Sequence, residues 1–303
     1  MPRGRVCPGM AVSPAPKLDY DAALAYAERH KLHALVVARG GKVSFECYGP
    51  MYASDRPHAI YSGTKSFWGI AAVAAQEDGL LRLDEQVART IPQWEENPRK
   101  ELVTIRDLLN LTAGFGFGGL GNAVPIASAA LELPLQTMPG ATFTYGGIPL
   151  QVFGEVLRRK LASRNIEPHD YLRERIFDPI GLRIEAWRKL KDGTNPLPTG
   201  VTLGPLEWLK FGQLLLGRGT YKGKNVLSEA SVTACFEGSR ANPRYGLGFW
   251  LSPFPDEPGI VYASGSGGQA LYVLYAFDTV IVHLGESNSW KHETFLKKLL
   301  ARS

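Results

Sequence analysis

Hydrophobic residues at the two ends of the chain follow the patterns of strands and of the helices that cover them. Residues 19–33 repeat apolar positions at the helical period, and residues 288–301 predict a closing helix. A Gly40-Gly41 pair between two β-rich runs predicts a hairpin. The predicted strands are Ala34–Ala38, Val43–Tyr48, Tyr245–Leu251, Gly259–Tyr262, Gln269–Ala276 and Thr279–Leu284.

Helical periodicity dominates the middle of the chain, where the predicted helices cover residues 61–79, 104–111, 148–162, 170–177 and 205–216, with another from Ser228. This order of elements predicts an α+β protein, in which an antiparallel sheet is built from both ends of the chain and flanked by helices. We predict a flexible leader (1–17), a sheet domain (18–80 and 201–303) and an inserted, mainly helical region (81–200). The active site is expected between these two regions.

A serine and a lysine stand three residues apart, as Ser62 and Lys65, at the start of the apolar run 61–79. Positions i and i+3 share one face of a helix, so the hydroxyl and the amine point to the same place. A serine becomes a nucleophile only beside a base. Burial and the positive end of a helix both disfavour the ammonium form of lysine. Ser62 and Lys65 are therefore a candidate nucleophile and base, although Ser-x-x-Lys also arises by chance as a capping serine followed by an exposed lysine.

Two further segments could complete such a site. The turn at Pro139-Gly140 precedes Phe143 and Tyr145, and a rigidly held phenol near a neutral lysine can relay a proton to a leaving group. The segment Ala263–Gln269 carries three glycines between two predicted strands, and its backbone N–H groups could face a developing oxyanion. The alternatives are a pair of core aromatics and a plain hairpin turn.

Composition and charge exclude several classes of protein. The 303 residues are 45% hydrophobic and 21% charged, which is ordinary for a globular protein. The formal charge of +5 is mild. The basic clusters at Arg158–Lys160 and Lys297–Lys298 lie on amphipathic helices, without the basic stripe and exposed aromatics of a nucleic-acid site. We expect a small-molecule substrate and no nucleic-acid partner.

Cysteine spacing and hydropathy bear on the expected cofactors and on the expected cellular location. The three cysteines, Cys7, Cys47 and Cys235, lack the spacing of a disulfide framework or a zinc site. We expect no metal and no other cofactor. No segment approaches the roughly 18 apolar residues of a membrane span, and residues 1–17 lack the apolar stretch of a signal peptide. The expected location is cytoplasmic, and no oligomeric state is predicted.

In their order and spacing, these segments resemble the class C β-lactamase-like superfamily of serine hydrolases. That superfamily includes penicillin-binding-protein-type esterases, D-aminopeptidases and 6-aminohexanoate-dimer hydrolases. The resemblance covers roughly residues 32–284 and implies the β-lactamase/transpeptidase-like fold. It rests on Ser62-Gly-Thr-Lys65-Ser-Phe, Gly79–Asp84, Thr104–Leu109, Thr112–Gly114, Pro139–Tyr145 and Ser264–Gln269.

The resemblance also implies a role for each site residue. Ser62 would be the acylated nucleophile, Lys65 would take its proton, and Tyr145 would move protons among Lys65, Ser62 and the leaving group. The backbone N–H groups of Ser62 and Ser266 would form the oxyanion hole. The substrate-binding residues are expected to be Phe115, Gly147, Trp250, Ala263, Ser264 and Gly265.

Two departures from the family pattern bear on the substrate. Gly147 stands where the family often has asparagine, and Ala263 stands where it often has lysine, histidine or tryptophan. Loss of those side chains argues against β-lactamase or carboxypeptidase activity but leaves acyl transfer possible. We therefore predict an acyl-enzyme at Ser62 and a carboxylesterase acting on small esters. The alternatives are a linear amide hydrolase of the 6-aminohexanoate-dimer type and an inactive binding module on the same fold.

Overall fold

Both ends of the chain contribute to one six-stranded sheet with the order β2-β1-β11-β10-β9-β8. The computed structural model describes residues 18–257 and 259–302, and every neighbouring pair of strands in this sheet is antiparallel. The strands are β1 (Leu32–Arg39), β2 (Lys42–Tyr48), β8 (Trp250–Leu251), β9 (Ile260–Gly265), β10 (Gln269–Leu274) and β11 (Thr279–Gly285). The predicted fold class and the predicted Gly40-Gly41 hairpin are confirmed.

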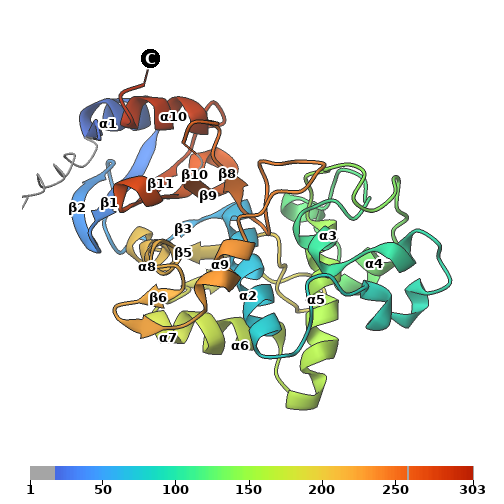
Figure 1. Ribbon diagram of the computed structural model, residues 1–303. Coiled ribbons are helices and arrows are strands. Elements are labelled where there is room, and N and C mark those ends of the chain that lie inside the picture. The colour runs from blue at the N-terminus through green and yellow to red at the C-terminus, as the bar shows by residue number, and fades with distance from the viewer. Residues whose placement is uncertain (1–17, 258, 303) are drawn as a thin grey trace, which may run out of the picture.

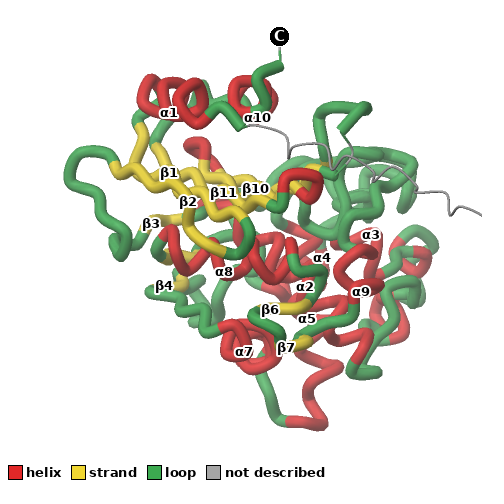
Figure 2. Tube along the Cα trace, turned by 60° about the vertical axis from the view of Figure 1, so that its left-hand side comes forward, coloured by secondary structure: helices red, strands yellow, loops and turns green. Residues whose placement is uncertain are grey.

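Helices cover both faces of this sheet. Helices α1 (Tyr20–Arg29) and α10 (His292–Leu299) lie side by side on one face, and α8 (Pro205–Leu216) packs on the other (Figures 1 and 2). Side chains along β1 alternate between the two layers, because Leu35 and Val37 belong to the α1/α10 side and Val36 and Ala38 to the α8 side. A sheet buried on both faces explains the continuous apolar runs of the sequence.

Helix α2 (Lys65–Glu77) runs through the middle of the molecule (Figure 1), and its residues from Lys65 to Ala75 are all buried. Its small residues permit close packing. At Gly69 an added Cβ would lie 1.9 Å from the carbonyl oxygen of Leu247. A 3₁₀ turn, Tyr61–Thr64, leads directly into α2 and carries Ser62.

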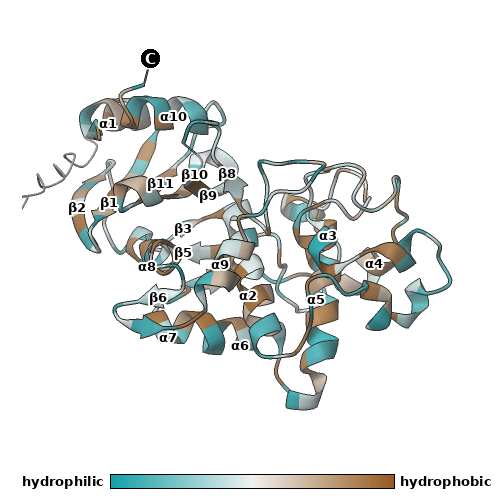
Figure 3. Cartoon of the chain, in the orientation of Figure 1, coloured by the Kyte–Doolittle hydropathy of each residue, from teal (hydrophilic) through white to brown (hydrophobic). Residues whose placement is uncertain are grey.

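The remaining elements surround α2, and those of the middle of the chain are mostly helical (Figure 1). The helices are α3 (Ile105–Leu109), α4 (Ala127–Glu132), α5 (Ile148–Leu161), α6 (Pro168–Leu172), α7 (Asp178–Ile180) and α9 (Glu229–Ala234). The short strands are β3 (His58–Ala59), β4 (Ala186–Trp187), β5 (Val201–Leu203), β6 (Thr220–Tyr221) and β7 (Lys224–Asn225). Helices α5 and α10 carry both hydrophobic and hydrophilic residues, as expected for helices that cover one side of a core (Figure 3).

Several local predictions can be compared with these elements. The capping box of Thr104 and Asp107 at the start of α3 is confirmed. The predicted strand Tyr245–Leu251 is wrong for its first five residues, because only Trp250 and Leu251 pair with β9. The chain before them turns back at Gly248, whose φ is +79°. The closing helix begins at His292, later than predicted.

The leader predicted for residues 1–17 lies outside the described residues. The division into a sheet domain and a helical insertion stays a prediction. Within residues 18–257 and 259–302, no helix combines the length and hydrophobicity needed to cross a bilayer.

Candidate active site

Ser62 and Lys65 meet as the sequence spacing predicts. Ser62 lies in the 3₁₀ turn and Lys65 is the first residue of α2, and the Lys65 Nζ lies 3.0 Å from the Ser62 Oγ. The turn is held tightly against the core, since a Cβ at Gly63 would lie 2.7 Å from the indole of Trp208. Tyr61, directly before the serine, has a φ of +47°, a left-handed conformation that is uncommon for an aromatic residue and often marks functional sites.

The surroundings of Lys65 favour its neutral form. Its side chain is 1% exposed, and no carboxylate in the described part of the chain pairs with it. The Nζ also donates to the carbonyl oxygen of Pro198 at 3.2 Å and lies 4.8 Å from the ring centre of Tyr145. Desolvation lowers the pKa of Lys65 to about 7. A neutral amine beside a serine hydroxyl can accept its proton.

Tyr145 lies beside both Ser62 and Lys65. Burial raises the pKa of its phenol, and a hydrogen bond with Ser62 acts in the opposite direction. The ring is stacked against Trp250, with centroids 5.8 Å apart, and meets Tyr245 edge-on at 6.2 Å. The phenol therefore stays protonated at neutral pH, which suits a proton donor rather than the initial base.

The end of β9 lies against the turn that carries Ser62. At Gly265 an added Cβ would lie 2.1 Å from the carbonyl oxygen of Ile60, so only glycine permits this approach. Ser266 follows at once, in a turn secured by the buried Gln269. The side chain of Gln269 donates to the carbonyl oxygens of Ser266 and Gly285, at 3.0 and 2.6 Å.

A cavity of about 640 Å³ opens in front of Ser62. Among the residues that line it, the sequence predicted six: Ser62, Tyr145, Trp250, Ser264, Gly265 and Ser266. Leu120 and Gly121 belong to the glycine-rich loop 114–121, which the sequence indicated as a wall of the pocket. The sequence missed four others: Tyr61, Thr199, Tyr262 and His292. Thr199 and His292 carry no sequence signal for a site, because long-range packing alone brings them to the cavity.

Three predicted substrate-binding residues lie elsewhere. Phe115 is buried against Trp94, with ring centroids 6.3 Å apart. The glycine-rich loop 114–121 turns this ring inward and leaves Phe117 77% exposed. Ala263 points into the core on the α8 side of the sheet, since side chains alternate along β9. Gly147 is buried and does not line the cavity.

Close packing around residue 147 requires glycine at this position. An added Cβ would lie 1.9 Å from the carbonyl oxygen of Gly119 and 3.0 Å from Pro198 Cγ. We expect Gly147→Asn, which restores the side chain common in the family, to lower the free energy of unfolding by about 1–3 kcal/mol. Urea unfolding measures this change, and we expect no nitrocefin turnover in either the variant or the wild type. A variant as stable as the wild type would contradict the crowding seen at this position.

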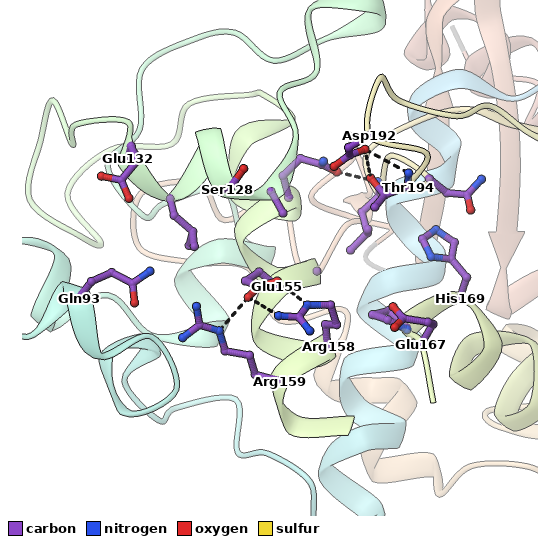
Figure 4. Close-up of a pocket in the computed structure, with 17 residues that line it drawn as sticks. Gln93, Ser128, Glu132, Glu155, Arg158, Arg159, Glu167, His169, Asp192 and Thr194 are labelled. Carbon is purple, nitrogen blue, oxygen red and sulfur yellow. Dashed lines mark hydrogen bonds and ion pairs between the residues drawn. The ribbon is translucent and has the colours of Figure 1, made fainter. Parts of the chain in front are cut away.

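A second cavity, of about 460 Å³, lies beside α4 and α5, away from Ser62 (Figure 4). Both arginines that line it are paired with one carboxylate, since Glu155 accepts from Arg158 at 2.7 Å and from Arg159 at 2.8 Å. Its only lining serine is Ser128, and no lysine or histidine of the described chain forms a hydrogen bond with that hydroxyl. In the described structure, this cavity therefore holds no serine that is paired with a lysine or a histidine, in contrast to Ser62 and Lys65. No group of three or more potential metal ligands occurs within the described residues.

The fold agrees with the comparisons with known proteins. The sequence model described as Beta-lactamase matches residues 24–302. The chain belongs to the Beta-lactamase family, a family of serine hydrolases.

Solved structures show the same fold at low identity. A provisionally named 6-aminohexanoate-dimer hydrolase from Bacillus anthracis superposes with a TM-score of 0.75 at 19% identity, over 92% of this chain and 80% of that one. The hydrolase EstCE1, described as having promiscuous acyltransferase activity, gives 0.72 at 17% identity, over 93% and 97%. A class C β-lactamase from Rhodobacter sphaeroides gives 0.71 at 18% identity, over 93% and 98%.

A curated relative is similar over part of its length. The chain is 27% identical to the monacolin J acid methylbutanoyltransferase of Aspergillus terreus, over 44% of this chain and 38% of that protein. The chain thus spans well under half the length of this relative.

Proposed function

We propose that this protein is a carboxylesterase that forms an acyl-enzyme at Ser62 and cleaves small esters. The observation that carries the proposal is the 3.0 Å contact between the Ser62 Oγ and the Nζ of Lys65. That lysine is buried, and no carboxylate in the described part of the chain holds its proton. Such a pair is arranged to activate an alcohol.

In the proposed first half-reaction, the Ser62 Oγ attacks the ester carbonyl carbon while its proton moves to Lys65 Nζ. The carbonyl oxygen becomes an oxyanion, which the N–H groups of Ser62 and Ser266 would stabilise. The C–O bond to the alcohol then breaks. Tyr145 gives its proton to the departing oxygen and recovers one from the Lys65 ammonium, leaving a neutral alcohol and an acylated Ser62.

In the second half-reaction, a water molecule takes the place of the alcohol. It attacks the acyl carbon, its proton passes to Lys65 Nζ, and the bond to Ser62 Oγ breaks. Ser62 regains a proton from Lys65, and a carboxylic acid leaves. The cycle consumes one ester and one water and needs no redox partner.

The substrate class follows from the missing polar side chains. Neither Gly147 nor Ala263 places an amide-binding side chain in the cavity, whose walls include Trp250, Tyr262 and Leu120. An activated or simple ester has a better leaving group than an amide, so it depends less on such contacts. Cleavage of a linear amide is the second candidate, and the 6-aminohexanoate-dimer name of one structural relative supports it.

A covalent probe tests the nucleophile directly. We expect a fluorophosphonate to label the wild-type protein and to leave Ser62→Ala unlabelled, because phosphonylation needs the activated hydroxyl. Intact-mass spectrometry measures the adduct. The exposed Ser128→Ala serves as the control and should label like the wild type. Equal labelling of Ser62→Ala and the wild type would reject the proposal, and absence of any adduct would favour a binding module.

The pH dependence of ester hydrolysis tests the base. Only the neutral amine of Lys65 accepts a proton, and its pKa lies at about 7. We therefore expect kcat/KM to rise through pH 7 and to level off above pH 8. The raised pKa of Tyr145 keeps the phenol protonated across this range. Initial rates between pH 5 and 9.5, corrected with Ser62→Ala, provide the profile. A rate that falls through pH 7 would contradict this assignment.

A further inference from the structure

A line of hydrogen bonds runs from Trp290, just before α10, through Tyr272 on β10 and His292 at the start of α10 to the cavity in front of Ser62. Trp290 Nε1 donates to the Tyr272 hydroxyl at 3.2 Å. The Tyr272 hydroxyl lies 2.7 Å from His292 Nδ1, and His292 Nε2 lies 2.8 Å from Ser264 Oγ. Ser264 and His292 both line the Ser62 cavity. At first sight, Ser264 and His292 form a second pair of serine and base, beside Ser62 and Lys65.

The direction of the line can be deduced from its buried end. An indole N–H only donates, so the Tyr272 oxygen accepts from Trp290. Tyr272 is fully buried, and the acceptor that remains for its own hydrogen in the described structure is His292 Nδ1. Desolvation lowers the pKa of His292 to about 4, so the ring is neutral. The single imidazole proton is therefore on Nε2.

This tautomer fixes the role of the serine. His292 Nε2–H donates to Ser264 Oγ, so the hydrogen of Ser264 does not go to His292 and can be directed into the cavity. In the opposite tautomer, His292 Nδ1 would carry the proton, and the Ser264 hydroxyl would donate to Nε2. The buried Tyr272 hydroxyl would then have no acceptor for its own hydrogen, which is unfavourable. Ser264 is thus a fixed donor, and His292 cannot act as its base.

We propose that His292 is a positioning residue that makes the Ser264 hydroxyl a hydrogen-bond donor to an acceptor oxygen of the substrate. The inference rests on the proposed esterase function and narrows its substrate class. The preferred esters carry an ether, carbonyl or carboxylate oxygen within reach of Ser264, in addition to the scissile ester. An apolar chain in the same place would leave the Ser264 hydrogen without a partner.

Two pairs of esters that differ by one oxygen in place of one methylene group measure this preference. On the acyl side, p-nitrophenyl methoxyacetate is compared with p-nitrophenyl butyrate. On the alcohol side, 2-methoxyethyl acetate is compared with butyl acetate. The quantity measured is the ratio of kcat/KM within each pair. Comparing this ratio between wild type and variants cancels the different intrinsic reactivities of the two esters.

Three variants distinguish a role of His292 in orienting the Ser264 hydroxyl from a purely structural role. Ser264→Ala removes the donor. His292→Asn keeps an acceptor near the Nδ1 position for Tyr272 but is too short to reach Ser264, whereas His292→Gln keeps an N–H near the Nε2 position. In at least one ester pair, we expect Ser264→Ala and His292→Asn to lower the ratio by roughly 3- to 10-fold. His292→Gln should keep the wild-type ratio.

Two results would overturn the inference: unchanged ratios in Ser264→Ala for both pairs, or equal loss in His292→Gln and His292→Asn. Fluorophosphonate labelling of Ser62 is measured in every variant. If Ser264→Ala is labelled at the wild-type rate and its kcat/KM ratios are unchanged, the role of His292 is rejected but the proposed esterase function is not. A wild-type protein that takes no label rejects the esterase function itself, and the inference falls with it.

Discussion

Replacing Lys65 with methionine should abolish ester hydrolysis and at the same time stabilise the protein. Methionine fills nearly the same volume, so the 3₁₀ turn and α2 should keep their packing. Without the amine, nothing at this position takes the proton of Ser62. Removing a general base beside a nucleophile lowers turnover by about 10³-fold or more. p-Nitrophenyl acetate hydrolysis measures the loss.

The gain in stability has a definite pH dependence. Burial lowers the pKa of Lys65 from its ordinary value to about 7, so the folded protein binds this proton less tightly than the unfolded chain. The lysine therefore destabilises the fold fully below pH 7, and the penalty disappears as the pH rises towards the unfolded pKa. We expect Lys65→Met to raise the free energy of unfolding on the order of 2–4 kcal/mol at neutral pH, with no gain near pH 10.5.

A second buried lysine provides the matched control. Lys100 donates to the carbonyl oxygen of Leu131 at 2.6 Å and lies over the ring of Trp94, and none of these three residues lines the Ser62 cavity. Lys100→Met should leave turnover unchanged. Urea unfolding of both variants at pH 6.5 and pH 10 completes the test. If Lys65→Met keeps wild-type turnover, Lys65 is not the base.

The second large effect is expected at Gly265, where one methyl group should separate the two N–H groups of the proposed oxyanion hole, those of Ser62 and Ser266. A Cβ at this position would lie 2.1 Å from the carbonyl oxygen of Ile60, an immobile backbone atom two residues before Ser62. Gly265→Ala must therefore push β9 away from the 3₁₀ turn. Loss of an oxyanion donor lowers kcat by about 10²–10³-fold. We expect a loss of that size in kcat with p-nitrophenyl acetate.

Gly259→Ala is the control for this substitution. Gly259 lies just before the same strand, but its added Cβ would meet nothing closer than 3.6 Å. Circular dichroism and urea unfolding show whether each variant remains folded. Equal kcat values for folded Gly265→Ala and Gly259→Ala would show that the approach of β9 to the turn does not matter for catalysis.

Features that depend on neighbours in the chain were determined by the sequence. The i, i+3 spacing brings Ser62 and Lys65 together because both follow one continuous helical path. The Gly40-Gly41 hairpin and the capping box at Thr104 are likewise local. The order of the predicted elements, with strands at both ends of the chain and helices between them, was enough to predict an antiparallel sheet covered by helices.

The tertiary structure alone decided which side chains face the reaction centre. Phe115 is buried and Phe117 exposed because of the path of one loop. Ala263 and Ser264 face opposite sides of the sheet because strand side chains alternate, but the pairing of β9 in the sheet decides that Ser264 is the one that faces the cavity. His292 reaches the cavity from the last helix of the chain. Periodicity specifies which face of an element is apolar, but a cavity forms where distant elements meet. The wall of the site therefore depends on long-range packing that no local pattern encodes.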